Sequence, residues 1–123
     1  MTETKEKIVY MATRGPENPE MAVMPFIHAV GALTMDVEAV VFLLANAAMI
    51  AKKGFAEQIK VGALPPLGEL LHNFQEMGGK LLVCGPCCKS RLIGEDEFVA
   101  GAKIVGAATL TQEVLSAKAV LNY

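Results

Sequence analysis

All three cysteines of the chain lie close together, in the stretch KLLVCGPCCKSRLIG at positions 80–94. Cys84 and Cys87 form a Cys-Gly-Pro-Cys motif, and Cys88 follows directly. Two thiols at this spacing at the start of a helix are able to form a disulfide, as they do in redox enzymes. The stretch therefore indicates thiol chemistry, which includes redox exchange, sulfur transfer and metal binding.

The residues around Cys84 favour a reactive thiol. Pro86 is typical of the first turn of a helix, where its missing N–H breaks no hydrogen bond. A helix that begins there places Cys84 just before its N-terminus, where backbone amides and the helix dipole favour negative charge. Lys89 and Arg91 add positive charge nearby. We therefore expect a lowered pKa for Cys84, which makes it the candidate nucleophile.

The spacing of the other two cysteines from Cys84 predicts a different role for each. Cys87 lies one helical turn after Cys84, so it is the candidate resolving thiol. A bridge between the adjacent Cys87 and Cys88 would need unusual backbone geometry. Cys88 is therefore expected to support the site without a primary chemical role.

The elements that position these thiols alternate along the chain. Asn18, Pro19 and Glu20 are typical of a helix start, with an N-cap, a first-turn proline and an acidic residue. The apolar patterns predict strands at 7–12, 37–44, 80–84 and 102–106, helices at 19–34, 46–54, 67–77 and 109–121, and a loop at 55–66. This order predicts one α/β domain over residues 1–123, a three-layer sandwich with a mostly parallel central sheet of four to five strands and helices on both faces.

Ligands of such sheets bind beyond the carboxyl ends of the strands. Cys84 ends the third predicted strand, Arg14 follows the first, and Asn46 follows the second. We expect these residues to lie along one rim, with Arg14 as a candidate for holding an anion.

Thioredoxins share the Cys-Gly-Pro-Cys tetrapeptide, but the rest of their pattern is missing here. Their motif follows a tryptophan, and a later cis-proline packs beside the disulfide. This chain has no tryptophan, Val83 precedes the motif, and no proline follows Pro86. A zinc site would need four ligands, and only Cys88, His28 and His72 are available to complete the single Cys-x-x-Cys pair. Neither a thioredoxin nor a zinc site therefore accounts for all the residues around the three cysteines.

With this order of elements, the segments GGKLLVCGPCCKSRLI and GAKIVGAATLTQEVL resemble the DsrE/DsrF-like family. Members often have a strand that ends in cysteine and an arginine seven residues on, which is the separation of Cys84 and Arg91. The resemblance implies assembly as trimers or hexamers. It also implies a persulfide on the strand-end cysteine that is handed to partner proteins. Leu92 departs from the glycine that commonly follows the arginine, and Cys87 and Cys88 are additional to the single-cysteine members.

Three functions stay open at this point. The first is a cysteine-based sulfur carrier with sulfurtransferase-type activity, which uses Cys84, takes sulfur from a donor protein and delivers it to an acceptor, with no cofactor. The second is thiol–disulfide exchange or peroxide reduction by the pair Cys84 and Cys87. The third is a metal-binding or assembly module without catalytic activity.

Composition narrows the class of protein. Hydrophobic residues make up 53% of the chain and charged residues 20%, which is typical of a folded domain and not of a disordered one. The net charge of −2 and the lack of a basic patch argue against nucleic-acid binding. The apolar stretch at 39–51 is shorter than the roughly 20 residues of a membrane span. The polar opening MTETKEK does not have the pattern of a secretory signal, so we expect a cytoplasmic protein, where clustered cysteines usually serve redox, sulfur or metal chemistry.

Overall fold

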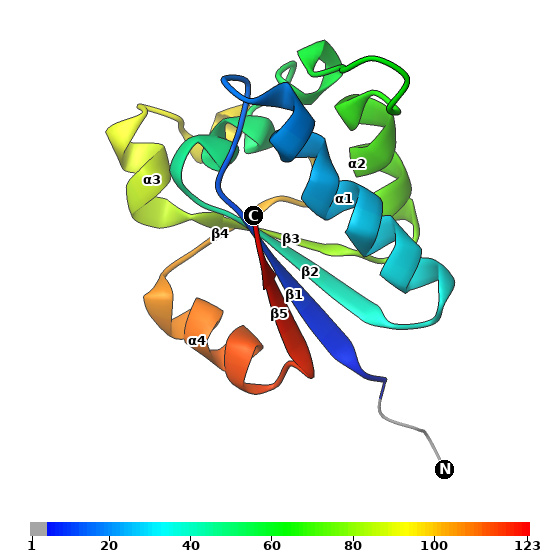
Figure 1. The fold of residues 1–123 in the computed structure, drawn as a ribbon. Helices are drawn as coiled ribbons and strands as arrows, with labels where there is room; N and C mark the ends of the chain where they lie inside the picture. Colours follow the sequence, from blue (N-terminus) through cyan, green and yellow to red (C-terminus); the bar gives the residue numbers. More distant parts are fainter. Residues whose placement is uncertain (1–4) are drawn as a thin grey trace.

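The sheet is entirely parallel and contains five strands (Figure 1). The computed structural model describes residues 5–123, and residues 1–4 of the polar opening stretch lie outside the described residues. The sheet order is β4-β3-β2-β1-β5. The strands are β1 (Lys7–Ala12), β2 (Glu38–Leu43), β3 (Lys80–Cys84), β4 (Lys103–Val105) and β5 (Ala119–Asn122).

Helices lie on both faces of this sheet. In Figure 1, α1 and α2 cover one face, α4 lies on the other, and α3 continues from the end of β3. The α-helices are α1 (Pro19–Thr34), α2 (Leu67–Glu76), α3 (Gly85–Ser90) and α4 (Ala107–Leu115), and the 3-10 helices are η1 (Ala45–Ala51), η2 (Ala56–Gln58) and η3 (Glu95–Glu97). Within residues 5–123, none of the helices has the length and apolarity that crossing a bilayer requires. The predicted three-layer α/β sandwich with a parallel sheet is confirmed.

The side chains of each strand alternate between two apolar layers. Val41 and Leu43 face the larger layer beneath α1 and α2, where the rings of Phe26 and Phe74 meet edge to face with centroids 5.6 Å apart. Complete burial of a side chain of this size contributes about 1.5–3 kcal/mol to stability. The opposite layer is smaller and centres on Val9, Val40, Phe42 and Leu82.

The end of the chain differs from the prediction. The expected helix over 109–121 is wrong, because α4 ends at Leu115 and residues 119–122 form β5 beside β1. The helix also begins two residues earlier than predicted, with Gly106 as its N-cap. The helical spacing of apolar residues in this segment does correspond to packing, because the smaller apolar layer is contacted by Leu110, Val114 and Ala117. Residues 119–122 form backbone hydrogen bonds with the free edge of β1, and α4 therefore ends before them.

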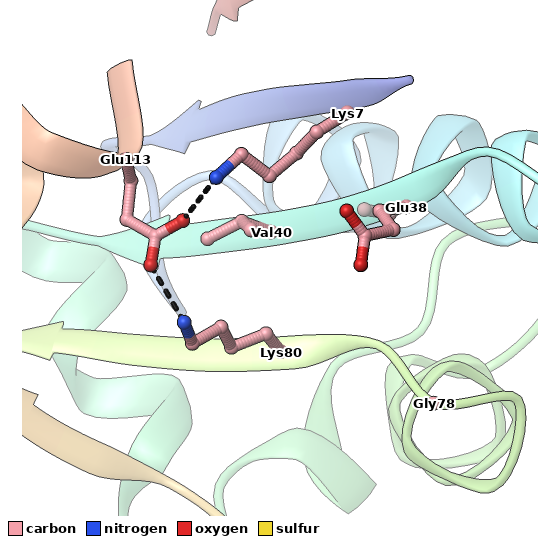
Figure 2. A pocket seen from close by; sticks show the side chains of 7 residues that line it. Lys7, Glu38, Val40, Gly78, Lys80 and Glu113 are labelled. Atoms are coloured by element: carbon pink, nitrogen blue, oxygen red, sulfur yellow. Dashed lines mark hydrogen bonds and ion pairs between the residues drawn. The ribbon is translucent and has the colours of Figure 1, made fainter. Parts of the chain in front are cut away.

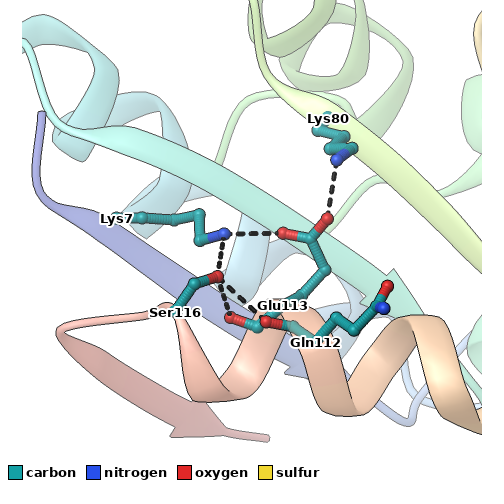
Figure 3. A network of polar contacts seen from close by, with 5 residues as sticks. All are labelled: Lys7, Lys80, Gln112, Glu113 and Ser116. Atoms are coloured by element: carbon teal, nitrogen blue, oxygen red, sulfur yellow. Dashed lines mark hydrogen bonds and ion pairs between the residues drawn. The ribbon is translucent and has the colours of Figure 1, made fainter. Parts of the chain in front are cut away.

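Two ion pairs made by one carboxylate, that of Glu113, anchor α4 to the sheet. Glu113 is the one residue of this helix that is buried. Its carboxylate accepts hydrogen bonds from Lys7 on β1 at 2.8 Å and from Lys80 on β3 at 2.6 Å, so it bridges two strands across β2 (Figure 3). Lys7 also donates to the hydroxyl of Ser116. The lysines and the carboxylate compensate for the sparse apolar contacts of α4.

Candidate thiol site

The three thiols lie where β3 passes into α3. Cys84 is both the last residue of β3 and the N-cap of α3, and proline occupies the first turn, as the sequence predicted. Cys84 and Cys87 are half-buried, whereas Cys88 is 1% exposed and belongs to the core. Two of the three cysteines are therefore partly accessible to solvent at the end of the sheet.

The pKa of Cys84 depends on its burial and on Cys87, which lies one turn further along the chain in α3. Burial raises the pKa of Cys84, and the neighbouring Cys87 side chain raises it further. The Cys87 amide and the charge of Arg91 act in the opposite direction without outweighing burial. The predicted lowering of the Cys84 pKa is therefore wrong, because Cys84 is half-buried against the smaller apolar layer, and the loss of water disfavours the thiolate.

A backbone amide from another segment reaches Cys87. The N–H of Ala45, the first residue of η1, donates a hydrogen bond to the Cys87 sulfur at 3.2 Å. Ala45 has φ +52°, in the left-handed region that residues other than glycine rarely adopt. The neighbouring backbone packs tightly, because a Cβ on Gly15 would lie 2.2 Å from the carbonyl oxygen of Asn46. The loop after β1 thus holds the start of η1 in place beside the thiols.

Arg91 is fixed by two of its neighbours. Its Nε and Nη2 donate to Oδ1 of Asn46 at 3.1 and 2.8 Å, and its Nη1 donates to the carbonyl of Cys87 at 3.2 Å. These bonds use the planar fork of the guanidinium, which an ammonium group cannot reproduce. The structure therefore brings together Cys84, Cys87, Arg91 and Asn46, which agrees with the rim position predicted for Cys84 and Asn46.

The remaining predicted site residues lie apart from this cluster. Arg14 and Lys89 are exposed, and within residues 5–123 no hydrogen bond or ion pair joins their side chains to the thiols. Burial raises the pKa of Cys88, which suits a packed thiol more than a reactive one. The site as built consists of two thiols, one guanidinium, one amide side chain and one backbone N–H.

The histidines do not join the thiols. His28 and His72 are both exposed, and Nδ1 of His28 pairs with the hydroxyl of Tyr123. In the part of the chain that the structure describes, no three histidine, cysteine or acidic side chains converge as a metal site would need.

A cavity of about 210 Å³ lies at the opposite end of the sheet (Figure 2). Its walls include Lys7, Lys80, Glu38 and Glu113, which sequence patterns did not single out. Burial works to raise the pKa of Glu113, but hydrogen bonds and charges from Lys7 and Lys80 outweigh it and hold the pKa below its usual value. Because Glu113 engages both lysines, this cluster serves first as the anchor of α4.

Three comparisons relate this chain to known proteins. The model of the DsrE/DsrF-like family matches residues 6–123. The protein MJ0989 of Methanocaldococcus jannaschii is 38% identical over 98 residues, which cover 80% of this chain and 82% of that protein. The crystal structure of ychN from E. coli has a TM-score of 0.82 at 22% identity, covering 96% of this chain and 99% of that one. MTH1491 of Methanobacterium thermoautotrophicum has a TM-score of 0.72 at 13% identity, covering 97% and 100%. At these identities the two structures are similar in fold alone.

Proposed function

The chain belongs to the DsrE/DsrF-like family, and on that premise we propose that it is a cysteine-based sulfur carrier. The observation that supports this most is the position of two half-buried cysteines, Cys84 and Cys87, three residues apart at the start of α3, with Arg91 held beside Cys87. The proposal includes cytoplasmic location, a single domain over 1–123, and assembly as a trimer or hexamer. It also includes a sulfur donor and a sulfur acceptor that are proteins.

Loading is a thiol exchange on a donor persulfide, R–S–SH. A thiolate of the pair attacks the outer sulfur, a new S–S bond forms on the protein, and the donor leaves as R–S⁻. The proton of the outer sulfur stays with it, so the protein gains one sulfur atom as Cys–S–SH. Arg91 supports negative charge at the pair during this exchange.

Unloading is the same exchange in the opposite direction. An acceptor thiolate attacks the outer sulfur, the S–S bond to the protein breaks, and the protein thiolate is regenerated. No electrons enter or leave in this cycle, so it needs no redox cofactor. Cys84 and Cys87 are both only half-buried, which is compatible with the approach of a second molecule.

Intact-protein mass spectrometry tests the proposal. The reduced protein is incubated with polysulfide, freed of excess reagent and weighed. Wild type and Cys88→Ser are expected to gain one sulfur atom, and the double variant Cys84→Ser, Cys87→Ser to gain none. An equal gain by the double variant would show that the pair is not the carrier.

The spacing of Cys84 and Cys87, at the N-cap and in the first turn of α3, also favours a second candidate function, thiol–disulfide exchange or peroxide reduction. That function requires a disulfide between Cys84 and Cys87 and turnover with a dithiol reductant. Peroxide consumption that depends on the dithiol, together with no sulfur uptake, would favour it over sulfur carriage.

A further inference from the structure

The positive charge of Arg91 is held in place by neutral groups. Its Nε and Nη2 both donate to Oδ1 of Asn46, and its Nη1 donates to the carbonyl of Cys87. Within residues 5–123, no carboxylate forms an ion pair with Arg91. Because both acceptors are uncharged oxygens, they orient the guanidinium without neutralising it.

The acidic residues that follow Arg91 in the sequence do not supply the missing negative charge. Glu97 of η3 pairs with Lys52 at 3.2 Å and accepts a hydrogen bond from the amide of Gly94 at 3.0 Å. Arg91 itself is half-buried. An arginine that is partly withdrawn from water favours an anionic partner, because its charge has lost part of its hydration.

The guanidinium has hydrogen-bond donors to spare. It carries five N–H groups, and the bonds to Asn46 and Cys87 use three of them, so each terminal nitrogen keeps one N–H. The Asn46 oxygen lies against the edge formed by Nε and Nη2, which leaves the edge formed by the two terminal nitrogens turned away from it. Two N–H groups of a planar fork are the usual way in which arginine binds the two oxygens of a carboxylate.

This guanidinium lies beside the two half-buried cysteines. Its Nη1 is 3.2 Å from the carbonyl oxygen of Cys87, and its charge acts to lower the pKa of Cys84 against the larger effect of burial. Cys84, Cys87 and Arg91 are all partly accessible to solvent. A molecule whose carboxylate binds Arg91 therefore brings the atoms next to that carboxylate close to the thiols.

We infer that Arg91 binds a carboxylate of the sulfur donor or acceptor, and that the pair Cys84–Cys87 exchanges sulfur preferentially with thiols that carry a carboxylate a few bonds from their sulfur. Low-mass thiol acids and proteins that end in cysteine both have this chemistry. The sulfur exchange rests on the proposed function, whereas carboxylate binding stands on the contacts of Arg91. Asn46 is a positioning residue, because it orients the guanidinium and touches no reacting atom.

The exchange itself stays balanced. The thiolate R–S⁻ of an acceptor whose carboxylate is bound to Arg91 attacks the outer sulfur of the protein persulfide. A new S–S bond forms, the S–S bond to the protein cysteine breaks, and R–S–SH leaves with the proton of the outer sulfur. The protein thiolate is regenerated, and the reverse exchange loads the protein from R–S–SH.

Two alkylating reagents test carboxylate binding without any sulfur donor. Iodoacetate and iodoacetamide attack the same thiolates and differ in the carboxylate, so the ratio of their rates does not depend on how much thiolate is present. The reduced wild-type protein is treated with each reagent, folded and after unfolding in urea. The ratio of the iodoacetate rate to the iodoacetamide rate is expected to be about tenfold higher in the folded protein. An equal ratio in both states would overturn the inference.

Three variants locate the effect. Arg91→Lys keeps the charge without the planar fork, and Asn46→Ala keeps Arg91 but releases it, so in both the ratio should fall most of the way to the unfolded value. Arg14→Lys is the matched control, since Arg14 is exposed and lies apart from the thiols, and its ratio should equal that of wild type. A ratio that Arg91→Lys leaves unchanged, or that Arg14→Lys abolishes, would contradict the role of Arg91. If Asn46→Ala does not fold, Arg91→Lys decides.

Matched acceptors extend the test to sulfur transfer. Protein that has gained one sulfur is given mercaptopropionate or mercaptoethanol and, in a second pair, a peptide that ends in cysteine with a free or an amidated carboxyl group. At equal thiolate concentration, the acid of at least one pair is expected to unload the protein about tenfold faster than its neutral counterpart, and the pair with the larger ratio identifies the source of the carboxylate. Equal rates within both pairs would refute carboxylate selection. A protein that takes up no sulfur but keeps the alkylation ratio would reject sulfur carriage alone.

Discussion

Arg91 and Asn46, 45 positions apart in the sequence, are joined by two hydrogen bonds from one guanidinium to one amide oxygen. The pair links α3 to η1 across the carboxyl ends of β2 and β3. Because Arg91 also binds the Cys87 carbonyl, its charge is held in one place beside the thiols.

The first prediction concerns Arg91→Lys. Lysine keeps the charge but cannot bond Asn46 twice and the Cys87 carbonyl at once. We expect polysulfide loading to slow about tenfold, which corresponds to a loss of about 1.4 kcal/mol of transition-state stabilisation. Stopped samples weighed by mass spectrometry give the rate, and the charge-conserving exchange Lys53→Arg at an exposed position serves as the control. A loading rate equal to that of wild type would show that Arg91 does not contribute to sulfur loading.

The second prediction concerns Leu92, the residue after the cap of α3. Leu92 has φ +56° and is 88% exposed. Burial of its side chain therefore does little to offset the cost of this left-handed conformation. The bonds from the Leu92 and Ile93 amides to Lys89 and Cys88 form the usual helix-ending motif in which glycine is favoured. Leu92→Gly should raise the free energy of unfolding by about 0.5–1 kcal/mol in urea denaturation, since glycine removes the strain.

Leu92→Ala separates this effect from loss of the side chain. Alanine shortens the side chain but keeps the unfavourable φ, so it should not be more stable than wild type. If Leu92→Ala is as stabilised as Leu92→Gly, the exposed side chain and not the backbone is the cause.

The third prediction concerns the anchor of α4. Glu113→Gln leaves Lys7 and Lys80 without their carboxylate, and it should lower the free energy of unfolding by about 1–3 kcal/mol, because Lys80 is half exposed and solvent limits the loss. Chemical denaturation measures it, and Glu69→Gln at an exposed site of α2 is the matched control. A change no larger than that of Glu69→Gln would mean that the ion pairs do not anchor the helix.

The fourth prediction follows from the lowered pKa of Glu113. A carboxyl whose pKa is lower in the folded state than in the unfolded state stabilises the fold above the unfolded value of about 4.3. That contribution is lost as the pH falls through the folded pKa. The difference in unfolding free energy between wild type and Glu113→Gln should therefore shrink on acidification from about pH 5. A difference that stays constant down to pH 2 would contradict this linkage.

Most of the fold was predictable from local patterns. The strands at 7–12 and 80–84 and the helix at 19–34 have the predicted bounds, because apolar runs and the Asn18 cap act locally. β5 was not predictable in this way. Its residues continue the helical spacing of α4, and only pairing with β1, more than one hundred positions earlier, makes them a strand.

The site was predictable in its residue types but not in its electrostatics. Cys84 and Asn46 follow from the rule that parallel strands end at one rim. Cys87 and Arg91 follow from their nearness to Cys84 in the sequence. The pKa of Cys84 depends on apolar neighbours from other strands, which the charges near it in sequence do not reveal. The contact of Ala45 is a backbone hydrogen bond from a residue with positive φ that is not glycine, so its type gives no signal.

Transfer of sulfur out of the loaded protein tests the central claim most directly. Wild-type protein that has gained one sulfur from polysulfide is freed of reagent and given an excess of a small thiol, and the products are trapped with iodoacetamide. Sulfur carriage by the Cys84–Cys87 pair predicts that the protein returns to its original mass while the added sulfur appears as the persulfide of the small thiol. Sulfur that remains on the protein in the presence of the acceptor would contradict the account.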